Sequence, residues 1–241
     1  MLYGQSYHKK FNEYARSLFE EVVRKVGWSK KQNEEHETLL LRTIVLYALG
    51  ANGDKETIKR ARRLFDQGKN IDADLRGVVY RLVAENGDRN DYDKLMKLYR
   101  QSPLAEEKDR VLRAICSFKQ EELLEKTLKF AFSDEARDQD LLKAFAFVWN
   151  NPAGRRLAFE YLKKKWPFIV EKFGGGHLFS RFVSPIDSFV TMEEADEVEI
   201  FFKKNTAPGI ERTVAQALEQ IRSNAAWLER DSGKIKKFLQ K

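Results

Sequence analysis

The sequence is short of cysteine, proline and long apolar runs, and each scarcity excludes a class of protein. Cys116 is the only cysteine among 241 residues, which excludes an internal disulfide and favours a reducing compartment. No run of about 18 apolar residues is present to span a membrane. The first residues, MLYGQSYHKKFNEY, also lack the apolar stretch of a secretory signal. We therefore expect a cytoplasmic chain without membrane contacts.

Histidine is scarce as well, and this argues against a metal site. A His-Glu-x-x-His helix places two histidines on one face, where they bind zinc while the glutamate activates water. The three histidines are His8, His36 and His177, and Leu40 stands where a second ligand would follow His36-Glu37. Cys116 has no histidine nearby in the sequence, so we expect a small core residue. The sequence predicts no catalytic residue and no cofactor in this chain.

The only glycine cluster, Gly174–Gly176, does not follow a predicted strand and lacks the Lys-Ser/Thr of a phosphate-binding loop. A flexible loop is the expectation, and a backbone nest for an anion is the alternative.

Positive charge is concentrated in the first half of the chain. The net charge is +7, and residues 1–120 hold 24 Lys and Arg against 18 Asp and Glu, whereas residues 121–241 hold 20 against 19. The two signs are interspersed, which is typical of a solvated surface. The aromatic residues lie in apolar stripes away from the basic ones, so we expect no nucleic-acid partner.

One basic segment follows Asp54, where five cations share a predicted helix: Lys55, Lys59, Arg60, Arg62 and Arg63. A solvated outer face is the simpler interpretation. The alternative is that some of these cations bind an acidic group or a terminal carboxylate.

An internal repeat of 34 residues shows how the helices are arranged. Asn52-Gly53-Asp54 recurs as Asn86-Gly87-Asp88, and Leu41-Arg42 recurs as Leu75-Arg76, each 34 residues later. Arg110 stands another 34 residues after Arg76. Each repeat contains an apolar helix, a turn rich in capping residues, and an amphipathic helix.

Such pairs bury their apolar faces by stacking. The landmarks of tetratricopeptide repeats are missing. We predict an all-α fold, an α-solenoid of HEAT- or armadillo-like antiparallel helix pairs that forms a concave bowl. We see no linker, so residues 1–241 are predicted to be a single helical-repeat domain, with the clearest repeats over 39–132.

The tail, residues 175–241, carries specific motifs. Thr191-Met192-Glu193-Glu194 predicts a capping box, and Pro208-Gly209 predicts a break before a long helix. The apolar stripe of that helix is predicted to pack against the preceding helices and to contain Ile210, Val214, Leu218, Ile221, Ala225 and Leu228.

The same tail resembles the end of the M1, or gluzincin, zinc aminopeptidases, with the greatest likeness to the puromycin-sensitive enzyme. The resemblance rests on these motifs: Phe201-Phe202, Ala207-Pro208-Gly209, Glu211-Arg212-Thr213, Asn224-Ala225-Ala226-Trp227-Leu228 and Arg230-Asp231. More diffusely, it extends to Gly175-Gly176-His177-Leu178-Phe179-Ser180-Arg181 and through the helical pairs from about Leu39.

The resemblance implies a non-catalytic C-terminal domain of such an aminopeptidase, which walls the substrate cavity and helps hold the distal part of a peptide. Zinc and the catalytic domain, its expected partner, would lie in other parts of the parent enzyme. Arg42, Arg76 and Arg110 are predicted to form a peptide-binding row because they occupy equivalent repeat positions, and Arg181 is added from the resembling stretch. The alternative is a free-standing α-solenoid scaffold for protein partners.

Overall fold

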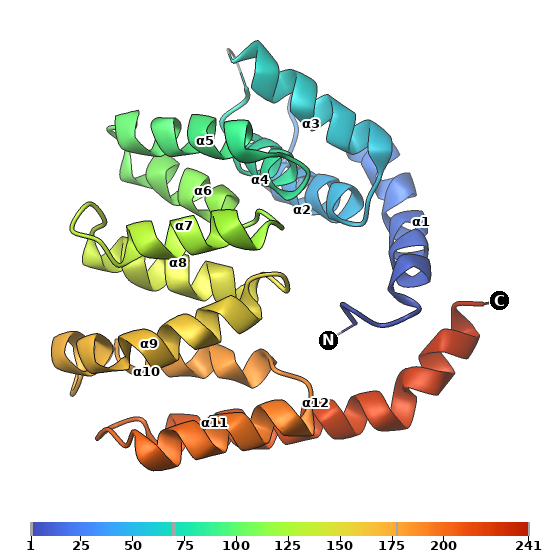
Figure 1. The fold of residues 1–241 in the computed structure, drawn as a ribbon. Helices are drawn as coiled ribbons and strands as arrows, with labels where there is room; N and C mark the ends of the chain where they lie inside the picture. The colour runs from blue at the N-terminus through green and yellow to red at the C-terminus, as the bar shows by residue number, and fades with distance from the viewer. Residues whose placement is uncertain (1, 69–70, 177, 241) are drawn as a thin grey trace. The chain divides into compact units, whose positions relative to one another are not determined.

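A computed structural model describes residues 2–68, 71–176 and 178–240. Within these ranges the chain has twelve α-helices, one 3-10 helix and no strand (Figure 1). The all-α fold of successive helix pairs predicted from the repeat is thereby confirmed. Two compact units are present, Gly4–Lys119 and Gln120–Lys241, the second of which includes Leu2 and Tyr3. The concave bowl and the single domain over residues 1–241 stay predictions.

The unit Gly4–Lys119 contains six helices. These are α1 (His8–Val26), α2 (His36–Ala51), α3 (Lys55–Gln67), α4 (Arg76–Glu85), α5 (Arg89–Gln101) and α6 (Ala105–Ile115). Helix α2 contacts α1, α3 and α4, and α6 contacts both α4 and α5. Its core joins α2, α3 and α4 through Leu46, Ala61, Leu75, Val78 and Leu82, with Val23, Trp28, Tyr47 and Ile71 packed around them.

The two Asn-Gly-Asp turns have the same sequence but different backbone geometry. Gly53 has a φ of +87°, which favours glycine, and Asp54 caps α3 by accepting a 2.8 Å hydrogen bond from the Thr57 amide. Gly87 does not have a positive φ. There, an added Cβ would lie only 2.5 Å from Asp91 Oδ2 and 2.6 Å from the Val83 carbonyl oxygen. The second turn therefore requires glycine for space, because Asp88 and Asp91 form a capping box around it.

The second unit contains the remaining elements. These are α7 (Glu121–Ala131), α8 (Asp138–Asn150), α9 (Arg155–Phe173), α10 (Ser180–Val183), η1 (Ser184–Ser188), α11 (Met192–Lys204) and α12 (Glu211–Phe238). Helix α9 contains Pro167 in its interior. Trp166, Ile169 and Phe173 are all buried, so packing on both sides of the proline maintains the helix. Gly174 then caps it, and Gly175 has a φ of +76°.

Aromatic rings fill much of the core of this unit. Trp149 lies 6.0 Å from Phe159 and 5.7 Å from Phe189, measured between ring centroids. Trp166 lies 5.6 Å from Phe201 and 5.3 Å from Phe202, so the Phe201-Phe202 motif of the tail packs into this core.

The tail forms the predicted break and long helix, but its buried face is rotated. Thr191 and Glu194 form the capping box, and Gly209 has a φ of +91° two residues before α12 begins. Of the predicted stripe, Ile210, Ile221 and Leu228 are buried, whereas Leu218 is only half-buried. Ala217 and Asn224 are buried on this face instead. Pro208 lies in the turn and not in the first helical turn.

Candidate functional site

Arg42, the first member of the predicted peptide-binding row, lies inside its unit. It is 2% exposed, and its guanidinium donates to the carbonyl oxygens of Gly27 at 3.1 Å and Val26 at 2.9 Å, and to Glu34 Oε1 at 2.5 Å. The hydrogen bond from Arg42 holds the pKa of Glu34 below its ordinary value. Arg42 therefore ties the end of α1 to α2. Its place in a peptide-binding row stays a prediction, and the burial of its guanidinium argues against that role.

Arg76 and Arg110, the next two members, meet at one carboxylate. Glu107 Oε2 lies 3.6 Å from Arg76 Nη1 and accepts a 2.9 Å hydrogen bond from Arg110 Nη1. The Tyr80 hydroxyl donates to Glu107 Oε1 at 2.9 Å, and Arg110 also pairs with Glu106. Burial, reinforced by this hydrogen bond, raises the pKa of Tyr80 to about 12. The side chains of Arg76 and Arg110 are 38% and 27% exposed, so both keep access to solvent.

Arg181, the fourth predicted residue, is exposed on the short helix α10 of the second unit. Among the described residues, no carboxylate forms an ion pair with it. His177, which belongs to the same resembling stretch, lies outside the described residues.

A half-buried cluster of Tyr47, Arg81 and Glu85 in the first unit, called the Tyr47 cluster below, was not predicted from the sequence. The Tyr47 hydroxyl donates to Glu85 Oε1 at 2.5 Å and accepts from Arg81, whose guanidinium carbon lies 3.6 Å from the centroid of the Tyr47 ring. Burial raises the pKa of both Tyr47 and Glu85. Tyr47 and Arg81 are 34 residues apart, so the repeat itself held the signal. The cluster joins α2 to α4.

The basic segment on α3 divides into structural and available cations. Arg62 forms two hydrogen bonds with Asp91, Nη1 to Oδ1 at 2.6 Å and Nη2 to Oδ2 at 2.8 Å, and so connects α3 to α5. Lys59 pairs with Glu56 at 3.1 Å on the surface. Arg60 and Arg63 have no carboxylate partner in the part of the chain that the structure describes. The segment is therefore not a uniform solvated face.

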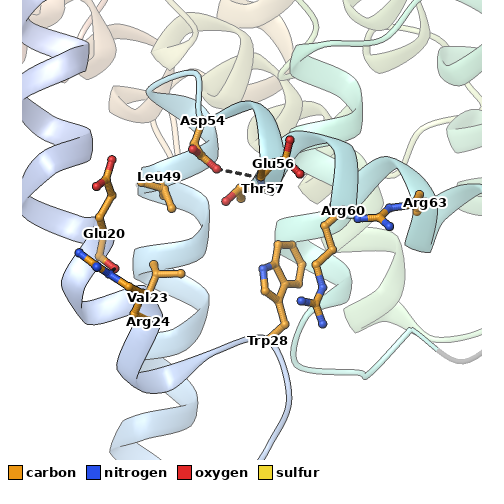
Figure 2. Close-up of a pocket in the computed structure, with 10 residues that line it drawn as sticks. All are labelled: Glu20, Val23, Arg24, Trp28, Leu49, Asp54, Glu56, Thr57, Arg60 and Arg63. Carbon is orange, nitrogen blue, oxygen red and sulfur yellow. Dashed lines mark hydrogen bonds between the residues drawn. The ribbon is translucent and has the colours of Figure 1, made fainter.

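Arg60 and Arg63 line a pocket of about 510 Å³ between α1, α2 and α3 (Figure 2). The lining residues are Glu20, Val23, Arg24, Trp28, Leu49, Asp54, Glu56, Thr57, Arg60 and Arg63. The guanidinium carbon of Arg60 lies 5.1 Å from the centroid of the Trp28 ring, within the range of a cation–π contact. Figure 2 shows Glu20 and Arg24 on one wall and Glu56 and Arg60 on the other. Helix α1 precedes the repeat, so the 34-residue pattern gave no hint of this pocket.

The residues that the structure describes do not fit a catalytic zinc ion. No group of three or more His, Cys, Asp or Glu side chains among them is arranged to hold a metal. Cys116 is buried as predicted, and burial raises the pKa of its thiol. No helix in the described ranges is long and apolar enough to cross a membrane.

The successive helix pairs and the tail motifs resemble the helical C-terminal domain of the M1 aminopeptidase class. The family described as "ERAP1-like C-terminal domain" matches residues 1–223, and the chain belongs to this family. The predicted resemblance is thereby confirmed. The likeness to the puromycin-sensitive enzyme in particular stays a prediction. The family match ends before Asn224, so the last two tail motifs lie beyond it.

Curated relatives agree with this assignment. Aminopeptidase M1 of Arabidopsis thaliana is 36% identical over 223 residues, which is 88% of this chain and 25% of the relative. Aminopeptidase M1-C of Oryza sativa subsp. japonica is 35% identical over 224 residues, or 89% of this chain and 25% of the relative. Aminopeptidase 2, mitochondrial, of Saccharomyces cerevisiae is 26% identical over 236 residues, which is 95% of this chain and 25% of the relative. The chain therefore spans about a quarter of the length of these relatives.

Proposed function

We propose that this chain walls the substrate cavity of an M1-type zinc aminopeptidase and helps hold the distal part of peptide substrates. The observation that carries the proposal is the family match over residues 1–223, because it assigns nearly the whole chain to the C-terminal domain of such enzymes. The catalytic domain of the same enzyme is the proposed partner. Zinc and its ligands would belong to that domain. We also propose a cytoplasmic location, for which the single cysteine argues.

The proposed mechanism is enclosure and remote binding. A wall around the cavity excludes water, and contacts with the far end of a peptide supply binding energy that positions its N-terminal residue at the metal. Of the predicted arginines, Arg181 supports this role best because no described carboxylate pairs with it. Arg76 and Arg110 already share Glu107, so a peptide carboxylate would bind them by competing with Glu107 and Glu106. Arg42 is left out of the binding role.

The test compares long and short substrates in the complete enzyme encoded with this chain. Replacing Arg110 and Arg181 by alanine should lower kcat/KM for a long peptide by about three- to tenfold, the effect of losing one or two exposed charge-assisted hydrogen bonds. A single-residue amide, which has no distal part, should be unaffected. Arg89→Ala is the matched control, because Arg89 is an exposed arginine on α5.

Two results would contradict the proposal. Equal effects on the long peptide and the amide would assign these arginines to structure. A reading frame that contains this chain but encodes no His-Glu-x-x-His helix would favour the free-standing scaffold.

A further inference from the structure

The pocket between α1, α2 and α3 carries opposite charges at its two ends. On α1, Glu20 precedes Arg24 by four residues, and on α3, Glu56 precedes Arg60 by four. Residues four apart lie on one helix face and are separated by about 6 Å along the axis. Each wall therefore presents one carboxylate and one guanidinium to the same space (Figure 2).

Contacts between the helices fix how the two walls are aligned. Arg16 Nη1 donates to the Asn52 carbonyl oxygen at 2.6 Å, which places the middle of α1 beside the turn between α2 and α3. Arg42 binds the carbonyl oxygens of Val26 and Gly27, which places the end of α1 beside the start of α2. Glu20 and Glu56 consequently lie toward the turn that contains Asp54. Arg60 lies over Trp28, whereas the Arg24 side chain folds back so that its Nε lies 3.4 Å from the Glu20 carbonyl oxygen (Figure 2).

The charges at the Trp28 end remain available to a ligand. In the described ranges, Arg24, Arg60 and Arg63 form no ion pair, and Arg24 donates only to the carbonyl oxygen of Glu20 on its own helix, at 3.4 Å. At the other end, Glu56 contacts Lys59 on the exposed surface, and Asp54 Oδ1 accepts from the Thr57 amide. Glu20 has no ion-pair partner among the residues described. Val23 and Leu49 give the space between the two ends an apolar lining.

We propose that this pocket binds apolar dipeptides with both termini free. An extended chain spans about 3.5 Å per residue, so a dipeptide places its ammonium and carboxylate groups about 6 to 7 Å apart, which matches the spacing of Glu56 and Arg60 along α3. The peptide carboxylate lies near Arg60 and Arg63, and the ammonium group lies near Glu20 and Glu56. The apolar side chains pack against Val23, Leu49 and Trp28. This proposal does not depend on the proposed function, because it requires only this chain.

The first experiment titrates the 241-residue chain with leucyl-leucine while the indole N–H resonance of Trp28, assigned by Trp28→Phe, is followed by NMR. We expect saturable binding with a Kd of about 1 mM, the weak affinity that suits an open and solvated pocket. Acetyl-leucyl-leucine and leucyl-leucine amide each lack one terminal charge and should each bind about tenfold more weakly. Failure of leucyl-leucine to shift the Trp28 resonance at about ten times that concentration, or equal binding of all three compounds, would overturn the proposal.

Variants then test which end of the pocket holds which terminus. Glu20→Gln should weaken leucyl-leucine several-fold but leave the acetylated compound unchanged, since that compound has no ammonium group. Arg60→Gln should weaken leucyl-leucine and its acetylated form but not the amide. Arg89→Gln, on the exposed face of α5, is the matched control and should change none of them. If Glu20→Gln affects both compounds equally, or if Arg60→Gln has no effect while circular dichroism shows an unchanged fold, the proposed orientation is wrong.

Discussion

At the scale of single residues, the polar side chains that matter most here are buried and bind backbone groups. Asn224 on α12 donates from Nδ2 to the carbonyl oxygens of Asp187 and Phe189, both at 2.9 Å, and its Oδ1 accepts from Gln220. These carbonyl groups lie at the end of η1, where the chain leaves helical geometry and lacks its own donors. Asn224 thereby supplies hydrogen bonds that the local backbone cannot.

Asn224→Leu should lower the free energy of unfolding by about 2 to 3 kcal/mol. The change leaves two carbonyl groups without their hydrogen-bond donor, and leucine does not reproduce the shape of the asparagine side chain. Denaturant unfolding of the variant and of Gln216→Leu, an exposed position on the same helix, makes the comparison. A loss below about 0.5 kcal/mol would show that water replaces the amide.

Asp91 gives a pH-dependent prediction. Its side chain is 7% exposed, and although burial alone would raise its pKa, the hydrogen bonds from Arg62 and the Asp88 backbone hold that pKa below its ordinary value. A carboxyl whose folded pKa is depressed stabilises the fold above its unfolded pKa, and this stability is lost as the pH falls through the folded pKa. Asp91→Asn should therefore cost about 1 to 2 kcal/mol at pH 7.

The cost of Asp91→Asn should shrink as the pH falls below about 4, the ordinary value for an aspartate. Urea unfolding at several pH values measures this difference, with the exposed Asp74→Asn as the control. A cost that does not change with pH would assign the effect of Asp91 to shape and capping instead of charge.

At the scale of elements, α12 shows where an apolar stripe read from sequence is informative and where it fails. The stripe identified the helix, two of its buried residues and the buried Ile210 just before it, but it made Leu218 part of the core. The structure gives that place to Ala217, and the half-buried Leu218 borders an apolar groove with Phe202 and Val214. Leucine and alanine one position apart differ in size, so the neighbouring helix decides which of them faces inward.

Ile221→Ala should cost about 2 to 5 kcal/mol, because Ile221 is 0% exposed and its truncation leaves a cavity. Leu218→Ala, the change expected from sequence to cost as much, should cost about 1 kcal/mol, in keeping with partial burial. Thermal or denaturant unfolding of both variants tests the order of the two effects. A larger cost for Leu218→Ala than for Ile221→Ala would show that Leu218 belongs to the core.

Local patterns predicted the helix pairs well and the candidate site poorly. The caps at Asp54, Asp88 and Thr191 depend on residues within a few positions of one another, so the sequence could predict them, although it did not distinguish the backbone geometry of the two Asn-Gly-Asp turns. The burial of Arg42 depends on where the carbonyl groups at the end of α1 lie, which the local sequence does not reveal. Arg62 likewise pairs with a residue 29 positions later. The pocket forms between three helices, one of them outside the repeat, so no spacing along the chain reveals it.

At the scale of the whole molecule, the chain is a quarter-length member of an aminopeptidase family with two compact helical units. The isolated chain should bind no stoichiometric zinc and release no amino acid from aminoacyl amides, since neither His36 nor the other histidines form a His-Glu-x-x-His pair. Metal analysis and a fluorogenic amide assay check this. About one equivalent of zinc together with turnover above the blank would contradict the assignment.

The predicted single domain can be tested by calorimetry. The sequence repeat runs over 39–132, and only five residues separate Ile115 at the end of α6 from Glu121 at the start of α7. We therefore expect one unfolding transition with equal calorimetric and van't Hoff enthalpies. Two separate transitions would show that Gly4–Lys119 and Gln120–Lys241 fold independently.

The Tyr47 cluster has a consequence for how this family can diverge. Its three side chains bind one another across two repeats, so changing one of them leaves a half-buried charge or hydroxyl without its partner. A lineage that replaces Tyr47 by phenylalanine has little reason to keep an acid at position 85 or an arginine at position 81. We expect the three positions to be inherited as a set in related domains, either all polar or all apolar, with mixed combinations rare.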